Sequence, residues 1–399
     1  MPHSRDRYIR SLIQKALGHS PIVGILGHRQ VGKTTLASGL ANEYVTFDSA
    51  SELENAIDHP TEFLENRKTP FAVDEAQLCP SLFPAAKEWV RTHLKKGQFI
   101  FTGSVRFTAR KLIRESLTGR IINLEVLPMT WSELNELPLP SHLSTLAKIN
   151  STSKLAHWQD LCVSKKSKSF LDYLESGGLP GICFFRDASV RQARFESHLD
   201  TILNRDLHLI MATTLSSLQL RKLASYLAQT QGTPLELKSA ARACQVSTAT
   251  VKKLLIAFEA LFLIRPISSE GTVAKTSYFF EDQGLATHLL RSAPSLSEQI
   301  LRGIYANLRQ ELHYRPHPKN EIFAFRTHDG TEVPLVFRTH AGVVGVIPSD
   351  ETTPTLKARA SARSFLEHFP DAKVVITTTG FQAETRDYKT FALPFWWLC

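Results

Sequence analysis

A short glycine-containing segment near the start of the chain has the residue types and spacing of a phosphate-binding loop. Residues 27–34 read Gly-His-Arg-Gln-Val-Gly-Lys-Thr and match the pattern G-x-x-x-x-G-K-[ST]. Gly27 and Gly32 allow the backbone to approach a ligand that a Cβ atom would block. Lys33 supplies a positive charge for the outer phosphates, and the hydroxyl of Thr34 suits Mg²⁺. The residues expected to hold a nucleotide are Gly27, Gln30, Val31, Gly32, Lys33, Thr34 and Thr35.

An acidic pair further along the chain could supply the metal ligand and the base that hydrolysis needs. The run "PFAVDEAQ" reads as an apolar strand that ends in Asp74 and Glu75. We expect Asp74 to hold Mg²⁺ through water, together with Thr34, and Glu75 to polarise the attacking water as general base. The alternative is a solvated turn, which is the commoner meaning of an acidic pair at a strand end. The cofactors expected are therefore ATP and Mg²⁺.

Two further side chains are candidates for the catalytic set. The run "FIFTGS" reads as an apolar strand ending in Thr102 and Ser104. If this strand lies between those of the loop and of Asp74, Thr102 or Ser104 could bond the water or the γ-phosphate; the alternative is an ordinary Thr-Gly turn. Arg120 precedes another strand and could touch the γ-phosphate, in its own subunit or a neighbour's. A surface ion pair is the alternative for Arg120.

The elements that must position these residues alternate between strand and helix. Apolar strand-like runs at 21–26, 44–47, 71–75, 98–103 and 121–127 are separated by helical stretches, which predicts a parallel sheet covered by helices. We expect four segments: a phosphate-loop domain at 1–134, a linker and helical lid region at 135–215, a winged helix-turn-helix at 216–268, and a C-terminal α/β domain at 269–399.

The middle of the chain has the spacing of a winged helix. A helix "LKSAARAC" and the turn "QVS" lead into a second helix from Thr248, for which Ser247 is the expected N-cap. Exposed polar and basic residues at 247–253, including Lys252 and Lys253, suit contacts with the phosphates of duplex DNA. The alternative is a module that packs as a lid or binds protein.

These motifs, in this order, resemble a prokaryotic AAA-type ATPase family related to the STAND and archaeal ATPases. The segments that carry the resemblance are "RQVGKTTL", "VDEAQ", "FTGS", "ESLTGR", "LEVLPMTWSEL", "YLESGGLPGI", "LNRDLHLI" and "SYFFEDQGLATHLL". The resemblance implies an AAA-type (ASCE) phosphate-loop sheet, a winged helix and a C-terminal restriction-nuclease-like domain. It also implies ATP binding and hydrolysis by Lys33, Thr34, Asp74 and Glu75.

The C-terminal segment departs from the nuclease pattern of those relatives. Relatives often have a helix glutamate where this chain has Tyr305-Ala306-Asn307, an aspartate where it has Pro334, and a glutamate and lysine where it has 346–349, Val-Ile-Pro-Ser. Glu332, Asp350 and Glu351 remain nearby, but a full metal-binding set does not assemble. We therefore expect an inactive nuclease-like fold that binds DNA, a protein or a sister subunit, with "FALPFWWLC" packed in its core.

Composition limits the remaining classes of function. The 399 residues carry 47 Lys and Arg against 38 Asp and Glu, a net charge of +9, which favours nucleic acid or acidic partners. The five cysteines (Cys79, Cys162, Cys183, Cys244 and Cys399) are scattered without CxxC pairs, so we expect neither zinc nor disulfides. No apolar run reaches the roughly 18–20 residues that span a bilayer, and the N-terminus lacks a signal-peptide core, so we expect a cytoplasmic protein.

The first functional hypothesis is a Mg²⁺-dependent ATPase whose nucleotide state switches domain arrangement or partner binding. The second is a nucleotide-gated DNA-binding protein that uses the winged helix and the C-terminal domain. A partner-binding protein with a relic nucleotide site is a third, which the intact Gly-Lys-Thr and Asp-Glu sequences disfavour. The process served, the partner and the oligomeric state remain open, as does the choice between binding and hydrolysis.

Overall fold

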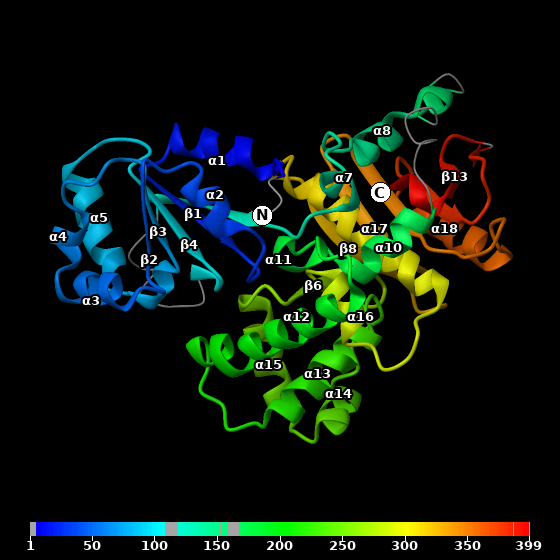
Figure 1. The fold of residues 1–399 in the computed structure, drawn as a ribbon. Coiled ribbons are helices and arrows are strands. Elements are labelled where there is room, and N and C mark those ends of the chain that lie inside the picture. The colour runs from blue at the N-terminus through cyan, green and yellow to red at the C-terminus, as the bar shows by residue number, and fades with distance from the viewer. Residues whose placement is uncertain (1–4, 108–118, 152–153, 159–166, 386, 399) are drawn as a thin grey trace. The chain divides into compact units, whose positions relative to one another are not determined.

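The computed structural model describes residues 5–107, 119–151, 154–158, 167–385 and 387–398 and shows a mixed α/β chain (Figure 1). Its residues divide into two compact units, each assembled from several stretches of chain. We call the first the phosphate-loop unit; it comprises Met1–Pro128, Leu179–Ser217 and Lys253–Leu263. We call the second the large-sheet unit; it comprises Met129–Gly178, Leu218–Lys252 and Ile264–Cys399. The division into four consecutive domains stays a prediction.

The phosphate-loop unit is built on a five-stranded parallel sheet of order β2-β3-β4-β1-β5. Its strands are β1 (Ile22–Gly27), β2 (Glu43–Thr46), β3 (Phe71–Asp74), β4 (Phe99–Gly103) and β5 (Ile121–Val126). The strand β4 lies between β1 and β3, as the sequence predicted. Strands β1, β3 and β4 are buried along their whole length, as expected for a parallel sheet with helices on both faces.

Helices cover both faces of this sheet. Figure 1 shows α3 (Ala50–Asp58), α4 (Pro60–Leu64) and α5 (Leu82–Thr92) on one side and α1 (Ile9–Leu17) and α2 (Lys33–Ser38) on the other. Phenylalanines fill the space under α3–α5, among them Phe63, Phe71, Phe83, Phe99 and Phe101. Further along the chain, α11 (Pro180–Cys183), α12 (Ala188–Thr201), the π-helix η3 (Ile202–Asp206) and the short helix η4 (Leu207–Leu209) complete this unit.

The large-sheet unit contains an eight-stranded mixed sheet of order β12-β13-β11-β10-β9-β8-β6-β7. The strands are β6 (Ile264–Gly271), β7 (Thr276–Phe280), β8 (Glu321–Arg326), β9 (Glu332–Thr339), β10 (Gly342–Ile347), β11 (Lys373–Thr378), β12 (Glu384–Thr385) and β13 (Thr390–Pro394). Its helices include α7 (Trp131–Leu134), α8 (His142–Lys148), α10 (Ser167–Ser176), α13 (Ser217–Gln229), α14 (Leu237–Cys244), α16 (Gln283–His288), α17 (Leu296–His313) and α18 (Leu356–His368). The hairpin β6–β7 joins this sheet because β6 pairs in parallel with β8.

The predicted helix-turn-helix has the expected local structure. Helix α14 ends at Cys244, Gln245 takes a left-handed conformation with φ of 57°, and α15 (Thr248–Ala260) follows. Ser247 is the N-cap, since its hydroxyl accepts a hydrogen bond from the Thr250 backbone nitrogen at 3.0 Å. The residues of α15 divide between the two units at Lys253. The winged-helix assignment stays a prediction.

The C-terminal segment lacks a metal cluster wherever the structure describes it. No group of three or more His, Cys, Asp or Glu side chains that could hold a metal occurs among the described residues. Pro334 lies in β9, where the pairing with β8 is irregular, and Glu332 forms an ion pair with Arg326 at 2.7 Å. The restriction-nuclease-like assignment stays a prediction. Core packing of the aromatic C-terminus is confirmed, since Phe395, Trp396, Trp397 and Leu398 are all buried.

Two further sequence predictions concern cysteines and membranes. Cys79, Cys183 and Cys244 are free thiols, whereas Cys162 and Cys399 lie outside the described residues. Within the described ranges, no helix combines the length and the apolar character required to cross a membrane.

Candidate nucleotide-binding site

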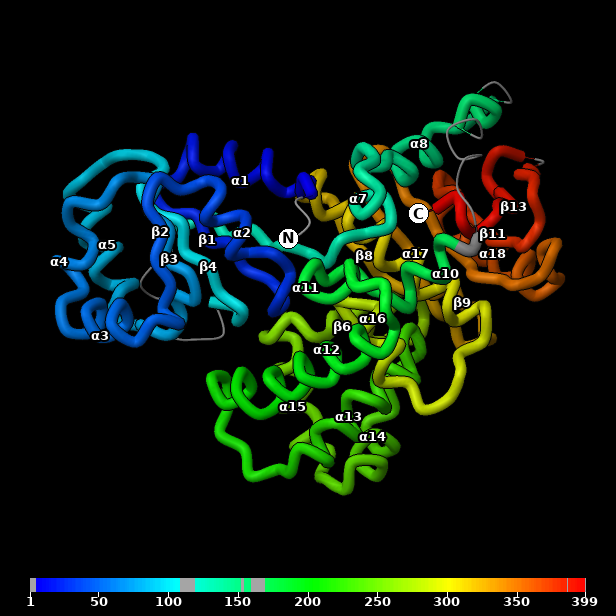
Figure 2. The backbone as a smooth tube through the Cα atoms, in the orientation of Figure 1, coloured from blue at the N-terminus to red at the C-terminus, as the bar shows by residue number. Residues whose placement is uncertain are grey.

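The glycine loop connects β1 directly to α2 at the carboxyl edge of the parallel sheet. Figure 2 shows the chain running from β1 through this loop into α2. Gly27 and Gly32 have φ of 153° and 99°, and a Cβ atom at Gly27 would lie 2.4 Å from the carbonyl oxygen of Val126. Gln30 also takes a positive φ, of 61°. The loop therefore needs glycine at position 27 for close packing as well as for its backbone angles.

Lys33 lies inside the loop that it is expected to serve. Its side chain is buried, and Nζ donates to the backbone carbonyls of Gly27 at 3.1 Å and His28 at 3.0 Å. Burial lowers the pKa of the Lys33 ammonium, while the negative charges of Glu75 and Asp74 raise it. The ammonium thus lies within reach of both predicted carboxylates. This arrangement brings the phosphate-binding cation and the acidic pair to one place, as the sequence predicts.

Asp74, the predicted metal residue, accepts hydrogen bonds from three hydroxyls. Thr34 Oγ1 donates to its Oδ2 at 2.7 Å, Tyr44 donates to the same oxygen at 3.0 Å, and Thr102 donates to Oδ1. Burial, followed by the charge of Asp74, raises the pKa of the Tyr44 hydroxyl. Thr34 and Asp74 thus present adjacent hydroxyl and carboxylate oxygens, the hard ligands that Mg²⁺ prefers. The residues present fit this cation.

Glu75, the predicted general base, has a strained backbone. Its φ is 55°, a left-handed conformation that non-glycine residues rarely adopt, and its N–H donates to Thr102 Oγ1 at 3.1 Å. The carboxylate oxygen Oε2 accepts from Ser104 Oγ at 3.2 Å and from the side-chain amide of Gln77. Strain of this kind is common where the surrounding structure holds a functional group in position.

The hydrogen bonds of Thr102 differ from the predicted ones, which were to water or the γ-phosphate. Its hydroxyl hydrogen is directed to Asp74, and its oxygen accepts the N–H of Glu75. Ser104 likewise directs its hydroxyl to Glu75. In this structure both residues therefore position the two carboxylates instead of presenting a donor to the reacting atoms. The physical reason is that β4 lies beside β3, so its terminal hydroxyls meet the carboxylates across the ladder.

Arg120 lies at the opposite edge of the sheet from the loop. It precedes Ile121, which pairs with Ile22 at the start of β1, whereas Val126 pairs with Gly27 at the loop. At about 3.3 Å per residue, five residues of strand separate these ends by roughly 17 Å. The prediction that Arg120 touches a γ-phosphate in its own chain is therefore wrong, because parallel pairing puts the start of β5 at the amino edge of the sheet. Its action in a neighbouring subunit stays a prediction.

Two contacts from α12 and the π-helix reach the glycine loop, and the sequence analysis assigns no role to the residues that make them. The rings of His28 and His198 stack with centroids 4.9 Å apart and an interplanar angle of 26°. Arg29 Nη1 lies 3.4 Å from the carboxylate of Asp206. The segment 205–207, Arg-Asp-Leu, stood out only in the order of motifs, because nothing local links it to a loop more than 170 residues earlier.

Two of the other motifs meet in the large-sheet unit. Asp282 accepts the N–H of Gly178 at 2.7 Å and, as N-cap of α16, the N–H of Leu285 at 2.8 Å. Gly177 has φ of 68°, and a Cβ atom at Gly178 would lie 1.9 Å from the carbonyl oxygen of Met129. Gly177, Gly178 and Asp282 therefore belong to one closely packed contact within this unit.

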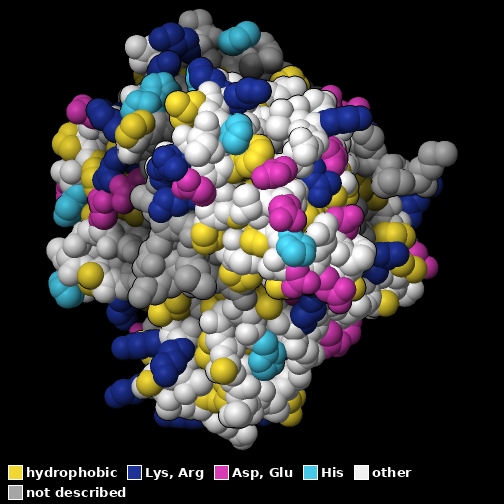
Figure 3. Space-filling model, turned by 90° about the vertical axis from the view of Figure 1, so that its left-hand side faces the viewer, with side chains coloured by type: hydrophobic (Ala, Val, Ile, Leu, Met, Phe, Trp, Pro, Cys, Tyr) yellow, Lys and Arg dark blue, Asp and Glu magenta, His cyan; other side chains and the backbone are white. Residues whose placement is uncertain are grey.

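The segment predicted to contact DNA carries two exposed lysines. Ser247, Lys252 and Lys253 are exposed on the described surface. In Figure 3, a group of Lys and Arg side chains lies at the lower left of the face shown, whereas the upper part of that face mixes both signs of charge. These exposures agree with a phosphate-binding surface but identify no partner.

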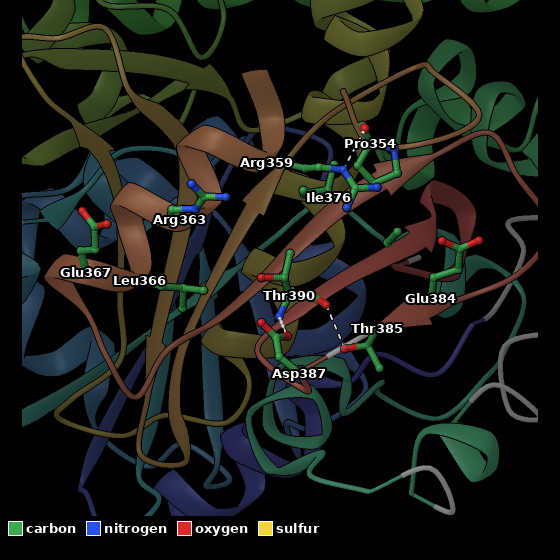
Figure 4. A pocket seen from close by; sticks show the side chains of 11 residues that line it. Pro354, Arg359, Arg363, Leu366, Glu367, Ile376, Glu384, Thr385, Asp387 and Thr390 are labelled. Carbon is green, nitrogen blue, oxygen red and sulfur yellow. Dashed lines mark hydrogen bonds between the residues drawn. The ribbon is translucent and has the colours of Figure 1, made fainter. Parts of the chain in front are cut away.

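A hollow of about 410 Å³ lies in the large-sheet unit (Figure 4). Helix α18 contributes Arg359 and Arg363, and acidic residues come from β12 and the turn after it. Asp387 is already used, since it accepts the backbone N–H groups of Lys389 and Thr390 at 2.8 Å each. Because the lining carries both signs of charge, we assign it no ligand.

Comparison with known proteins supports an AAA-type phosphate-loop family. Residues 19–135 match a family model described as AAA domain, and residues 167–296 match a domain of unknown function, DUF8612. Residues 19–135 are thus similar to AAA domains. The uncharacterized protein Rv2008c of Mycobacterium tuberculosis is 24% identical over 381 residues, covering 92% of this chain and 78% of its own length. An uncharacterized protein of Mycobacterium bovis, Mb2031c, matches to the same extent.

Two solved structures are similar to this chain. A Walker-type ATPase of Pyrococcus abyssi has 15% identity and a TM-score of 0.42, covering 72% of this chain and 96% of its own. A signal transduction ATPase with numerous domains from Pyrococcus horikoshii, which carries a tetratricopeptide repeat sensor, has 13% identity and a TM-score of 0.25. This match covers 79% of this chain and 48% of that one.

Proposed function

We propose that this protein binds ATP together with Mg²⁺ and hydrolyses it to ADP and phosphate. The observation that carries the proposal is the convergence of the loop and the acidic pair, with Thr34 Oγ1 2.7 Å from the carboxylate of Asp74. Lys33 Nζ donates to the loop carbonyls of Gly27 and His28, and the charges of Glu75 and Asp74 act on its ammonium. Cation, metal ligands and base are the parts that phosphoryl transfer to water requires.

The chain's own residues divide this work between them. Backbone N–H groups of the loop and the ammonium of Lys33 hold and orient the phosphates. Thr34 and Asp74 hold the metal, which when bound supplies charge neutralisation for the phosphate oxygens. Glu75 accepts a proton from the attacking water at its carboxylate, which Ser104 and Gln77 orient.

Phosphate release by the wild type and by two variants tests the proposal. Glu75→Gln should lower the rate about 10²–10⁴-fold, the usual contribution of a general base, while it keeps ATP binding. Lys33→Ala should lose binding as well. Glu88→Gln is a matched control, since it removes an exposed carboxylate of the same unit that pairs with Arg91 in its own helix. Equal release by wild type, Lys33→Ala and Glu75→Gln would refute hydrolysis.

We further propose that the nucleotide state switches the arrangement of the domains or the binding of a partner. A nucleotide-gated DNA-binding protein is the alternative, and the exposed Lys252 and Lys253 at the start of α15 favour it. Duplex DNA should then bind with an affinity that falls steeply with salt, and the double variant Lys252→Glu, Lys253→Glu should weaken it. Absence of binding at low salt, with and without ATP, would exclude this alternative.

A further inference from the structure

The π-helix that follows α12 brings one carboxylate to the glycine loop. Both oxygens of Asp206 lie 3.4 Å from Nη1 of Arg29, and the Asp206 side chain is only 3% exposed. Its chain neighbour Arg205 lies 4.0 Å from Asp206 and 3.6 Å from Asp48, and the Arg205 and Asp48 side chains are about half exposed. π-Helical turns are rare and often occur at functional sites. Here the turn η3 ends at Asp206, which pairs with Arg29 of the loop.

The loop position of Arg29 shows which part of the phosphate site Asp206 faces. Arg29 follows His28, whose carbonyl accepts a hydrogen bond from Lys33 Nζ at 3.0 Å, and Arg29 Nη1 lies 3.4 Å from Asp206. The charges of Arg29, Glu75, Arg205 and Lys33 all act on the Asp206 carboxylate. Lys33 is the residue that contacts the outer phosphates, and Glu75 is the proposed base for water that attacks the last one. We therefore place Arg29 and Asp206 at the end of the site that a γ-phosphate would occupy. A triphosphate fills this end and a diphosphate leaves it empty.

A buried carboxylate next to this position has a predictable effect on a triphosphate. Asp206 requires a nearby cation because an isolated buried charge is costly, and Arg29 supplies it. A γ-phosphate adds negative charge that competes for Arg29 and repels Asp206. A diphosphate does neither, since it ends one phosphate earlier.

We infer that the Arg29–Asp206 ion pair makes this site discriminate between nucleoside triphosphate and nucleoside diphosphate. Arg29 favours the triphosphate, and Asp206 opposes it by holding Arg29 and by repelling the γ-phosphate. Exchange of Arg29 from Asp206 to the γ-phosphate then signals the nucleotide state to the π-helix. This inference rests on the proposed nucleotide binding, and both residues act on specificity without taking part in bond breaking.

Dissociation constants for ATP and ADP, measured by calorimetry with Mg²⁺ on the full chain, test the inference. Asp206→Asn should raise the ratio of the ADP constant to the ATP constant about fivefold or more, because the repulsion disappears and Arg29 is released. Arg29→Gln should lower the same ratio about fivefold or more, because a buried negative charge is left beside the γ-phosphate. The double variant should lie between them.

Opposite shifts are the decisive outcome, because damage to the fold alone would weaken both nucleotides in both variants. Asp206→Glu, which keeps the carboxylate, should have the wild-type ratio of the two dissociation constants, unlike Asp206→Asn. Glu88→Gln should also leave this ratio unchanged. Unchanged ratios, or shifts in the same direction, would overturn the inference while ATP binding stands. Failure of the wild type to bind either nucleotide would overturn the proposed function, and the inference with it.

Discussion

Replacing Thr102 with valine tests whether this residue positions the acidic pair. Valine preserves the shape of the side chain but removes a hydroxyl that is fully buried and makes two hydrogen bonds. Loss of the charged bond to Asp74 costs about 1.5–3 kcal/mol, and the N–H of Glu75 left without this acceptor costs about 1–3 kcal/mol. The free energy of unfolding should therefore fall by about 3–5 kcal/mol.

Thermal unfolding of the nucleotide-free protein gives the measurement. At about 2–4 °C per kcal/mol for a unit of this size, Thr102→Val should lower the unfolding temperature by roughly 6–20 °C. Thr102→Ser keeps the hydroxyl and loses one methyl group, which costs about 1 kcal/mol. Phosphate release should follow the same order, with Thr102→Ser near the wild type. Equal effects of valine and serine, on stability or on rate, would refute the positioning role.

Three more predictions, made with four variants, test other parts of the structure. Asp282→Ala should lower the free energy of unfolding by about 3 kcal/mol, because the buried Asp282 carboxylate accepts hydrogen bonds from two N–H groups. Asp187→Ala removes an exposed N-cap and should lower it by about 1 kcal/mol. Denaturation curves that show the reverse order would contradict this prediction. Burial raises the pKa of Glu311 to about 7, above its ordinary 4.5, so the stability from its protonated form is complete below pH 4.5 and is lost as the pH rises to 7. Between pH 4.5 and 7, the free energy of unfolding of Glu311→Gln should therefore rise by roughly 3 kcal/mol relative to that of the wild type. Unfolding measured as a function of pH tests this, and a difference between the two proteins that stays constant with pH would contradict it. Arg120→Ala should leave phosphate release by the single chain within about twofold of the wild type, since the residue lies at the far edge of the sheet, and a large loss in dilute protein would refute that placement.

The parts of the site that could be predicted are those formed by residues close together in the sequence. A glycine loop between a buried strand and a helix has a short-range signature, and so has an acidic pair at the end of an apolar strand. Ser247 was predictable as an N-cap for the same reason. The place of β4 between β1 and β3 was stated as a condition and is met.

Contacts between distant segments could not be read in this way. His198 and Asp206 meet the loop across 170 and 177 residues of chain, and the residues around each of them in the sequence carry no signal for that contact. Tyr44 meets Asp74 because β2 and β3 are neighbours, which becomes evident only with the strand order. The sequence predicts that Thr102 or Ser104 could bond the water or the γ-phosphate; it does not reveal the bond from Thr102 to Asp74, because that partner depends on side-chain geometry.

The interleaved composition of the phosphate-loop unit limits how the chain can be divided. A fragment that stops at Asn135 would contain Lys33, Asp74 and Glu75 but would lack Asp206, which the same unit takes from a later stretch. Such a fragment would leave Arg29 without that carboxylate, so its nucleotide preference should differ from that of the whole chain. Modularity along the sequence and modularity in space are therefore separate properties in this protein. Separation of the two units would therefore require cuts at several points of the chain.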